Sequence, residues 1–310
     1  MVDSLQKIDE ETLVQLNLNK ARMTLVDKNR SNELLEAMPN PTQAAGGSAA
    51  NTAYWAAQLG GYVGFIGKIS NDELGIEFKE SVKKSGLNDF TIFETEDNQT
   101  GHCAIFITPD GERTMNTYLG AGAFLSVEDL NEEAIKSAEI LYMEGYLWDR
   151  PTSKEAFLYA AKLNKSSGGK NAITLSDVFC VEMHRDSFIE FIKESIDFVF
   201  CNEEEIMSLT MKETIDEAIN SFTNLFPNIE ELVCTLGPRG ALVISNGKKS
   251  HYDATEAEVV DKTGAGDYFA AGYLYGLQKK LSIEESADIA NRSAAYVISE
   301  VGVRPKNKFD

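Results

Sequence analysis

The sequence predicts an α/β fold in which helices flank a mostly parallel sheet and a small β-sheet lies beside it. Two observations predict this. Short β-type runs alternate with helical stretches over most of the 310 residues, a pattern typical of parallel strands joined by helices. One region breaks the alternation, because three strand-like runs follow one another without a helix between Asp89 and Leu119. Together these features favour a large α/β body with a small β-layer next to it.

The elements of the body follow in chain order. Apolar runs rich in β-branched and aromatic residues predict strands at 62–66, 140–144, 172–176, 198–201, 232–235 and 241–245. The stretches with helical spacing predict helices at 49–59, 72–85, 153–164, 185–195, 215–225, 265–281 and 283–299. The last helix starts at a capping box formed by Ser282 and Glu285.

The small β-layer is expected to contain the runs 90–94, 102–108 and 115–119. A turn at Pro109-Asp110-Gly111 separates the last two of these runs. A further strand-like piece at 23–27 is expected to join the layer. The alternative is that these strands form an antiparallel extension of the main sheet.

Composition excludes several classes of function. Acidic residues outnumber basic ones by 49 to 29, for a net charge of −20. This balance argues against nucleic acid or an anionic membrane as partner, although local backbone dipoles can still bind a phosphate. No apolar run approaches the ~18 residues of a membrane span, and the first residues lack the apolar stretch of a secretory signal. Four dispersed cysteines predict a reduced, cytoplasmic protein, and three scattered histidines argue against zinc.

The strongest chemical signal is the run Gly264-Ala265-Gly266-Asp267, where a strand end turns sharply into a helix. The first N–H groups of a helix have no partner within the helix, so they form an anion site that the helix dipole reinforces. Asp267, in the first turn, can accept a proton from a hydroxyl group while these amides hold a phosphoryl group. The alternative is an ordinary capped helix whose aspartate complements the dipole.

Three weaker signals accompany it. Gly46 and Gly47 open an Ala-rich helix in which Asn51 can bind polyol hydroxyl groups, unless the small residues serve helix packing. A strand ending near 201 delivers Asn202 and Glu205 to one helical turn, where their oxygen atoms suit Mg²⁺ through water. The alternative for this pair is a solvated acidic helix start. Thr235-Leu236-Gly237 follows another strand and could contact phosphates.

These four elements, in this order, make the chain resemble the ribokinase-type (PfkB) kinases over nearly its whole length. The resemblance implies a ribokinase-like fold in which the small β-sheet is a lid. It also implies transfer of the γ-phosphoryl group of ATP, with Mg²⁺, to a primary hydroxyl group of a sugar or nucleoside. Residues 46–86 and 126–310 would form a discontinuous nucleotide-binding core, and residues 1–45 and 87–125 the substrate-binding segment and the lid.

The resemblance also implies roles for single residues. Asp267 would be the base, and the amides of Gly264, Ala265 and Gly266 the anion hole. On the ATP side, Asn202 and Glu205 would act on Mg²⁺ and phosphate, Thr235 and Gly237 would touch ATP, and Asn291 would lie near the adenine ring.

Within this family the chain is more similar to adenosine kinases than to ribokinase, because a long insert precedes the glycine pair. Phe179 falls where those kinases place an aromatic ring against the nucleobase, although ordinary core packing is its alternative. Arg113 matches a lid arginine that approaches phosphates. The expected substrate-binding residues are Asp3, Gly46, Gly47 and Asn51 at the ribose, and Leu25, Leu119 and Phe179 at the base.

Two departures from the family pattern stand out. Family members usually begin with a strand that ends in Gly-Asn ahead of the position of Asp3, whereas this sequence starts at Met1. Either the translation start lies upstream or the chain lacks a core strand, which would leave unpaired backbone groups and loosen Asp3. The second departure is Lys262, where a small threonine is commoner. This lysine could approach the ATP phosphates or point to solvent.

Three other functions have weaker support in the sequence. The same site serves a kinase of ribose, fructose or a related polyol, so this alternative stays open. The presence of Asp267 argues against a catalytically silent nucleotide-binding regulator. A dinucleotide-binding oxidoreductase lacks support, because no Gly-x-Gly-x-x-Gly follows an early strand.

We expect a cytoplasmic enzyme of purine salvage, a monomer or homodimer, whose partner is a small-molecule nucleoside or sugar.

Overall fold

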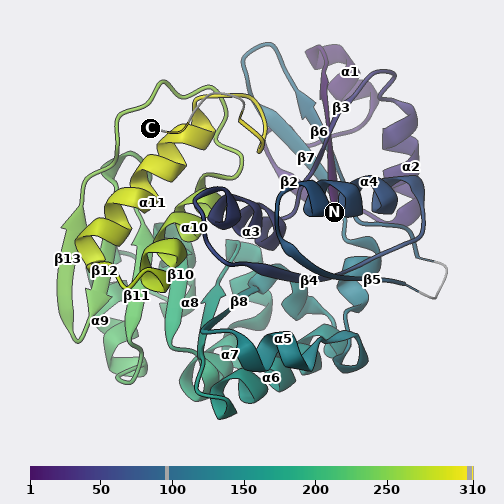
Figure 1. The fold of residues 1–310 in the computed structure, drawn as a ribbon. Helices are drawn as coiled ribbons and strands as arrows, with labels where there is room; N and C mark the ends of the chain where they lie inside the picture. Colours follow the sequence, from purple (N-terminus) through teal and green to yellow (C-terminus); the bar gives the residue numbers. More distant parts are fainter. Residues whose placement is uncertain (95–97, 306–308, 310) are drawn as a thin grey trace.

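The computed structural model describes residues 1–94, 98–305 and 309 (Figure 1). The described residues contain three sheets, with six, five and two strands. Helices cover the six-stranded sheet on both sides, which confirms the α/β prediction. No helix in this part of the chain is long and apolar enough to cross a membrane.

The six-stranded sheet has the order β13-β12-β11-β10-β9-β8. Its strands are β8 (Ile140–Glu144), β9 (Lys170–Thr174), β10 (Phe198–Asn202), β11 (Glu231–Thr235), β12 (Ala241–Ser245) and β13 (Lys248–Tyr252). The strands β8 to β11 are parallel to one another, whereas β12 and β13 are antiparallel additions at one edge. The parallel strands are apolar on both faces because both faces are covered.

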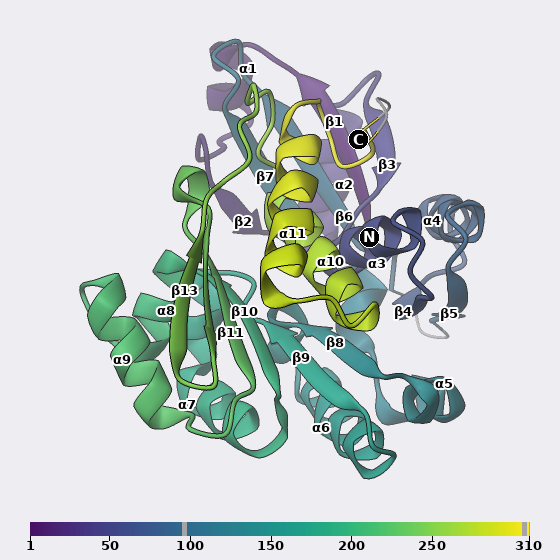
Figure 2. The same ribbon diagram turned by 60° about the vertical axis from the view of Figure 1, so that its left-hand side comes forward.

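Two helical layers provide that cover (Figure 2). One face packs on side chains from α6 (Pro151–Ser166), α7 (Val178–Ser195), α8 (Glu203–Thr210) and α9 (Ile215–Leu225). The other face packs on α10 (Ala265–Gln278) and α11 (Ile283–Ile298). The capping box predicted at Ser282 and Glu285 is present at the start of α11.

The five-stranded sheet has the order β2-β7-β6-β1-β3 and lies beside the body, as the β-layer was expected to do (Figure 1). Its strands are β1 (Val2–Lys7), β2 (Met23–Leu25), β3 (Thr42–Ala45), β6 (His102–Ile107) and β7 (Arg113–Tyr118), and its loops carry α1 (Glu10–Gln15) and α2 (Lys28–Glu36). Asp3 pairs with Ala44 on one side and Cys103 on the other. Asp3 therefore lies in an inner strand, and backbone pairing on both sides holds it in place.

The two-stranded sheet consists of β4 (Gly64–Ile69) and β5 (Asn88–Phe93), which pair in parallel. The run expected at 90–94 is part of β5, so its assignment to the small β-layer is wrong. The physical reason is the helix α4 (Glu73–Lys84), which supplies the crossover that a parallel pair requires. The helix α3 (Ser48–Gln58) precedes β4 in the chain.

Other boundaries differ for local reasons. The helix α7 begins at Val178 rather than at 185, because the Asp177 carboxylate accepts the N–H group of Phe179 and caps an earlier turn. His184 has non-helical backbone angles, and this kink interrupts the helical period that the sequence shows. The remaining elements are α5 (Glu132–Ser137) and four short 3₁₀ turns, at Gly120–Phe124, Val127–Asp129, Gly145–Asp149 and Gly237–Arg239. All four cysteines are buried and free.

The close packing of α10 on α11 generates a first prediction. A Cβ atom at Gly272 would lie 2.8 Å from the Cα atom of Ala290, so Gly272→Ala must push the two helices apart. We expect it to lower the free energy of unfolding by about 1–3 kcal/mol. Gly266→Ala is the matched control in the same helix, because a Cβ atom there meets nothing within 4 Å. Thermal unfolding followed by circular dichroism measures both, and equal melting temperatures would contradict the prediction.

Candidate active site

One cavity of about 1440 Å³ lies between the body and the five-stranded sheet. It opens at the carboxyl ends of β8, β10 and β11, where open α/β sheets bind their ligands. The predicted site residues that line it are Asp3, Leu25, Gly46, Gly47, Asn51, Arg113, Leu119, Asn202, Glu205, Thr235, Lys262, Gly264, Ala265, Gly266 and Asp267. The fold therefore brings together residues from nearly the whole length of the chain.

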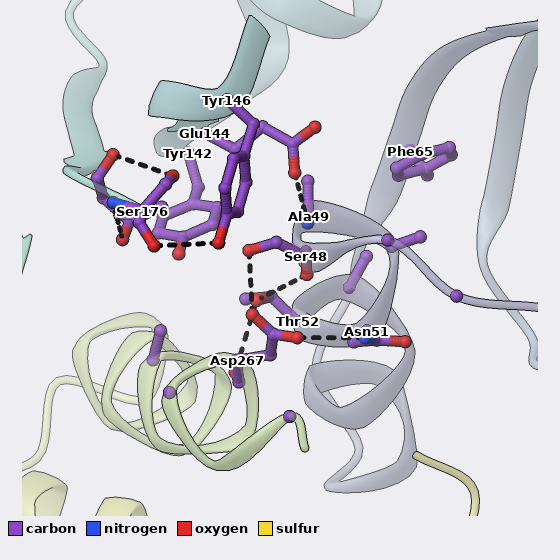
Figure 3. Close-up of a pocket in the computed structure, with 18 of the residues that line it drawn as sticks. Ser48, Ala49, Asn51, Thr52, Phe65, Tyr142, Glu144, Tyr146, Ser176 and Asp267 are labelled. Atoms are coloured by element: carbon purple, nitrogen blue, oxygen red, sulfur yellow. Dashed lines mark hydrogen bonds between the residues drawn. The ribbon is translucent and has the colours of Figure 1, made fainter. Parts of the chain in front are cut away.

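Asp267 lies in the first turn of α10 and faces the first turn of α3 (Figure 3). Its Oδ1 atom accepts a hydrogen bond from Ser48 Oγ at 2.8 Å, and its Oδ2 atom accepts one from Asn51 Nδ2 at 2.9 Å. The hydroxyl group of Thr52 donates to its backbone oxygen at 3.2 Å. The two helices thus meet at their N-terminal ends, and the Asp267 carboxylate is fixed between them.

Burial raises the pKa of Asp267, while the hydrogen bonds from Asn51 and Ser48 and the charge of Arg304 oppose that rise. Arg304 acts partly through Asn51, because its Nη1 atom donates to Asn51 Oδ1 at 2.8 Å. Its guanidinium group also lies over the ring of Tyr54, at 4.2 Å. The chain Arg304–Asn51–Asp267 orients the carboxylate and opposes part of the rise in its pKa.

The amides before Asp267 form the second half of the site. Gly264 has a left-handed backbone with φ of 79°, and a Cβ atom there would lie 2.9 Å from Val303. Among the described residues, the N–H groups of Gly264 and Gly266 find no protein acceptor, whereas that of Ala265 makes a long 3.3 Å bond to the Lys262 oxygen. Two of the three predicted amides are therefore free to bind an anion.

Asp3 reaches the cavity from the five-stranded sheet. Its side chain lies against Gly46, where a Cβ atom would come within 2.1 Å of the carboxylate oxygen. Only glycine at 46 leaves room for this carboxylate. Burial raises the pKa of Asp3 to about 6, and nearby Asp267 adds to the rise while the Met1 amino group and Arg304 oppose it.

Arg113 connects the five-stranded sheet to the loop before α10. Its guanidinium group forms an ion pair with Asp261 and donates to Thr263 Oγ1 at 3.0 Å. Asp261 is buried and also accepts the N–H groups of Thr263 and Gly302, at 3.0 and 2.6 Å. Arg113 thus lies beside the free amides at a point where the two parts of the molecule touch. Lys262, in the same loop, is exposed and borders the cavity.

The Asn202–Glu205 pair caps α8. Asn202 Oδ1 accepts the N–H group of Glu205 at 2.8 Å, and the two Glu205 oxygen atoms accept from the backbone and side-chain nitrogen atoms of Asn202 at 3.0 and 2.7 Å. Burial raises the pKa of Glu205 to about 7. Direct metal coordination would compete with this cap, whereas a contact through a water molecule would leave it intact. Thr235 lies nearby, at the end of β11.

The apolar candidates form a separate group. Phe179, Leu25 and Leu119 line one small pocket together with Tyr146, whose ring centroid is 6.3 Å from that of Phe179. Leu25, Leu119 and Tyr146 also line the large cavity, so the small pocket adjoins it. Three predicted site residues are not among the described residues that line the large cavity: Phe179, Gly237 and Asn291. Asn291 is buried in α11.

Three residues of the site were missed by sequence reasoning. Ser48 follows the glycine pair, so its position was the one available signal. Glu144 ends β8 and accepts the N–H group of Ala49 at 2.7 Å, which places a further, half-buried carboxylate in the cavity (Figure 3). Arg304 lies beyond the last helix, and no local pattern there indicates a contact with Asn51.

The burial of Asp3 generates a prediction about stability and pH. Its pKa rises from 3.8 to about 6 on folding, so the folded state binds the proton more tightly and loses stability as the pH rises through this window. Asp3→Asn should therefore raise the free energy of unfolding by about 3 kcal/mol at pH 8 and by about half of that at pH 5. Urea unfolding at the two pH values measures the difference, and a gain independent of pH would contradict it.

Comparison with known proteins identifies the family and the fold. Residues 11–309 match the pfkB family carbohydrate kinase description. A solved probable sugar kinase from Rhizobium etli CFN 42 is 35% identical, with a TM-score of 0.91 and coverage of 99% of this chain and 92% of that one. The adenosine kinase from Sinorhizobium meliloti is 36% identical, with a TM-score of 0.89 and coverage of 98% and 93%. Probable fructokinase-6, chloroplastic, from Arabidopsis thaliana is 29% identical over 277 residues, which are 85% of this chain and 72% of the relative.

These comparisons confirm the resemblance that four short motifs predicted, and with it the ribokinase-like fold. They also confirm a phosphotransferase that acts on an alcohol group and uses ATP. The acceptor is a sugar or a nucleoside, since relatives of both kinds match. The chain belongs to the pfkB family of carbohydrate kinases.

Proposed function

We propose that this kinase transfers the γ-phosphoryl group of ATP to the 5′-hydroxyl group of adenosine. The observation that carries the proposal is the Asp267 carboxylate, fixed beside the free amides of Gly264 and Gly266 in one cavity. The apolar group around Phe179 adjoins that cavity and supports a purine rather than a bare sugar. The likeness to an adenosine kinase that is 36% identical supports the same acceptor.

The transfer is an in-line displacement. The hydroxyl oxygen attacks the γ-phosphorus atom as the bond from phosphorus to the bridging oxygen of ADP breaks, and the hydroxyl proton passes to the Asp267 carboxylate. The products are AMP and ADP. Entry of the hydroxyl group displaces the hydrogen bond from Ser48, while Asn51 keeps the carboxylate oriented.

The amides of Gly264 and Gly266 stabilise the negative charge on the transferring group. One such donor contributes about 2.7–4 kcal/mol to transition-state stabilisation. Arg113, held by Asp261 next to Thr263, adds positive charge on the same side. Because Arg113 belongs to the five-stranded sheet, its contact also covers the site and excludes water that would hydrolyse ATP.

The two ends of the cavity bind the two substrates. Asp3, beside Gly46 and Gly47, binds the ribose hydroxyl groups, and Leu25, Leu119 and Phe179 contact the base. On the other side, Thr235 and Lys262 border the space for the ATP phosphates. We further propose that Gly237 and Asn291 approach ATP when the nucleotide enters.

Mg²⁺, when bound, would neutralise phosphate charge. The Asn202–Glu205 pair fits a water-mediated contact with this ion, because both carboxylate oxygen atoms are already engaged by Asn202. In this role Glu205 would contact the ion through water, and Asn202 would keep its carboxylate in place.

A free sugar is the second candidate acceptor. The probable sugar kinase from Rhizobium etli supports it at 35% identity, and the same carboxylate and amides would serve a sugar hydroxyl group. An ADP-release assay with Mg·ATP and a panel of adenosine, inosine, ribose and fructose separates the candidates. Selective turnover of adenosine is expected. Turnover of the free sugars alone would show that the acceptor is a sugar and not adenosine.

The role of Asp267 as base generates a kinetic prediction. Asp267→Asn should lower kcat by about 10²–10⁴-fold and leave the protein folded. Since the pKa of Asp267 is raised, the parent should lose activity as the pH falls through that pKa, and the variant should lack this acid limb. Asp253→Asn makes the same change at a fully solvated loop and serves as control. A kcat for Asp267→Asn within tenfold of the parent would exclude Asp267 as base.

The position of Phe179 generates a prediction about specificity. Phe179→Ala removes apolar contact from the base, so the KM for adenosine should rise about 10- to 100-fold while the KM for ATP stays nearly constant. Phe93→Ala removes an equal ring from an exposed position on β5 and is the matched control. Steady-state kinetics with each substrate varied in turn provide both constants. Equal changes in the two KM values would show that Phe179 is only a packing residue.

A further inference from the structure

The small pocket next to the large cavity has a polar end. Besides the apolar residues around Phe179, it is lined by Cys180, Asp149 and His184. Asp149 ends the 3₁₀ turn that follows β8, and His184 is the residue at which α7 kinks. The volume of the pocket is about 10 Å³, roughly the space that one water-sized group occupies. The pocket can therefore hold one polar substituent of a larger ligand, but not the whole ligand.

Asp149 and His184 form a hydrogen-bonded pair. The Nε2 atom of His184 lies 3.3 Å from Asp149 Oδ1. Because an aspartate carboxylate only accepts hydrogen bonds, the imidazole N–H group is the donor. Among the described residues, no group donates a hydrogen bond to Asp149 Oδ2. This oxygen atom is therefore free to accept a hydrogen bond from a ligand.

A buried aromatic cluster holds both members of the pair. Trp148, directly before Asp149, is buried, and its ring stacks on that of Phe188 with the centroids 5.4 Å apart. Trp148 Nε1 donates to Ser187 Oγ at 2.8 Å, and this hydroxyl group donates to the backbone oxygen of His184 at 3.0 Å. The chain is thus fixed at both residues, so little ordering is needed when a ligand binds to Asp149.

The other polar side chains of the pocket are weaker partners for a donor. The Tyr146 hydroxyl group already donates to the backbone oxygen of Ser176 at 2.9 Å. Burial raises the pKa of the Cys180 thiol, which therefore stays neutral and accepts hydrogen bonds only weakly. Asp149 is the one carboxylate among the described residues that line the pocket. The pocket thus favours a ligand group that donates a hydrogen bond over one that only accepts.

A nucleoside in the large cavity would direct its base to this pocket. In adenosine the exocyclic amino group lies on the side of the purine ring away from the ribose. Leu25, Leu119 and Tyr146 line both the cavity and the pocket, and Figure 3 shows Tyr146 on the opposite side of the cavity from Asp267. With the 5′-hydroxyl group at Asp267, the amino group therefore points toward the pocket.

We propose that Asp149 binds the exocyclic amino group of a purine base and that His184 positions Asp149 for this contact. The free carboxylate oxygen accepts a hydrogen bond from the 6-amino group of adenosine. A 6-oxo group in the same place would bring two acceptors together, so inosine is disfavoured. The inference rests on the proposed function, because it concerns the base of the nucleoside that the enzyme phosphorylates.

Substrate analogues test the contact in the parent enzyme. Purine riboside carries a hydrogen atom in place of the amino group, and inosine carries an oxo group. The kcat/KM for adenosine should be at least about tenfold above that for either analogue. Equal values for adenosine and purine riboside would overturn this inference and leave the kinase proposal in place. A parent enzyme that does not phosphorylate adenosine would overturn both.

Two variants assign the contact to Asp149. Asp149→Ala should bring the kcat/KM for adenosine to within about threefold of that for purine riboside. Asp149→Asn should lower the adenosine-to-inosine ratio at least about tenfold, because an amide can donate to the oxo group. Each ratio compares two substrates on one preparation, so a loss of folded protein cancels. Asp186→Asn, an exposed change on α7, is the matched control and should keep the parent ratios. Parent ratios in Asp149→Ala would overturn the proposal.

The same ratios test the role of His184. His184→Phe keeps an aromatic ring but removes the N–H donor, so the preference for adenosine over purine riboside should fall about three- to tenfold. The kcat/KM for purine riboside should stay within about twofold of the parent value. His184→Gln retains an N–H donor and should restore part of the preference. An equal loss of kcat/KM for both nucleosides in His184→Phe would show a merely structural role and exclude His184 as a positioning residue.

Discussion

The hydrogen bonds from Ser48 and Asn51 to Asp267 are the constraint on which the rest of the site depends. They join the first turn of α3 to the first turn of α10. Both helices begin at a glycine with positive φ, Gly47 and Gly264, so neither chain entry blocks the space in front of the amides. The result is a carboxylate in a fixed place with free hydrogen-bond donors beside it. This is the arrangement that phosphoryl transfer to a hydroxyl group requires.

The arrangement has a cost in stability. Asp3, Glu144 and Asp267 face one cavity, and burial raises the pKa of each. Mutual repulsion adds to this effect, while positive charge on the Met1 amino group, Arg304 and Arg113 opposes it at Asp3. A ligand that brings hydroxyl groups to these carboxylates replaces the hydrogen bonds to water that burial removed. Ligand binding therefore recovers part of the folding free energy that this burial costs. The three carboxylates are in this way unfavourable for folding.

Local patterns in the sequence were a better guide to the site motifs than to the order and pairing of the strands. The turn before Asp267 and the capping box at Ser282 are encoded within a few adjacent residues, so both could be predicted. The pairing of β5 with β4, and the inner position of β1, depend on contacts between distant segments. Arg304 reaches Asn51 across most of the chain, and no spacing rule connects the two. Asn202 and Glu205 were predicted together, but the capping box that they form is visible only in the structure.

A complex with ADP, adenosine and aluminium fluoride, a planar mimic of the transferring phosphoryl group, tests the central claim most directly. Crystallography should place the fluoride atoms within about 3 Å of the Gly264 and Gly266 nitrogen atoms, and the 5′-oxygen within about 3 Å of a carboxylate oxygen of Asp267. A fluoride group bound elsewhere, with Asp267 still held by Ser48 and out of reach of the 5′-oxygen, would contradict the account.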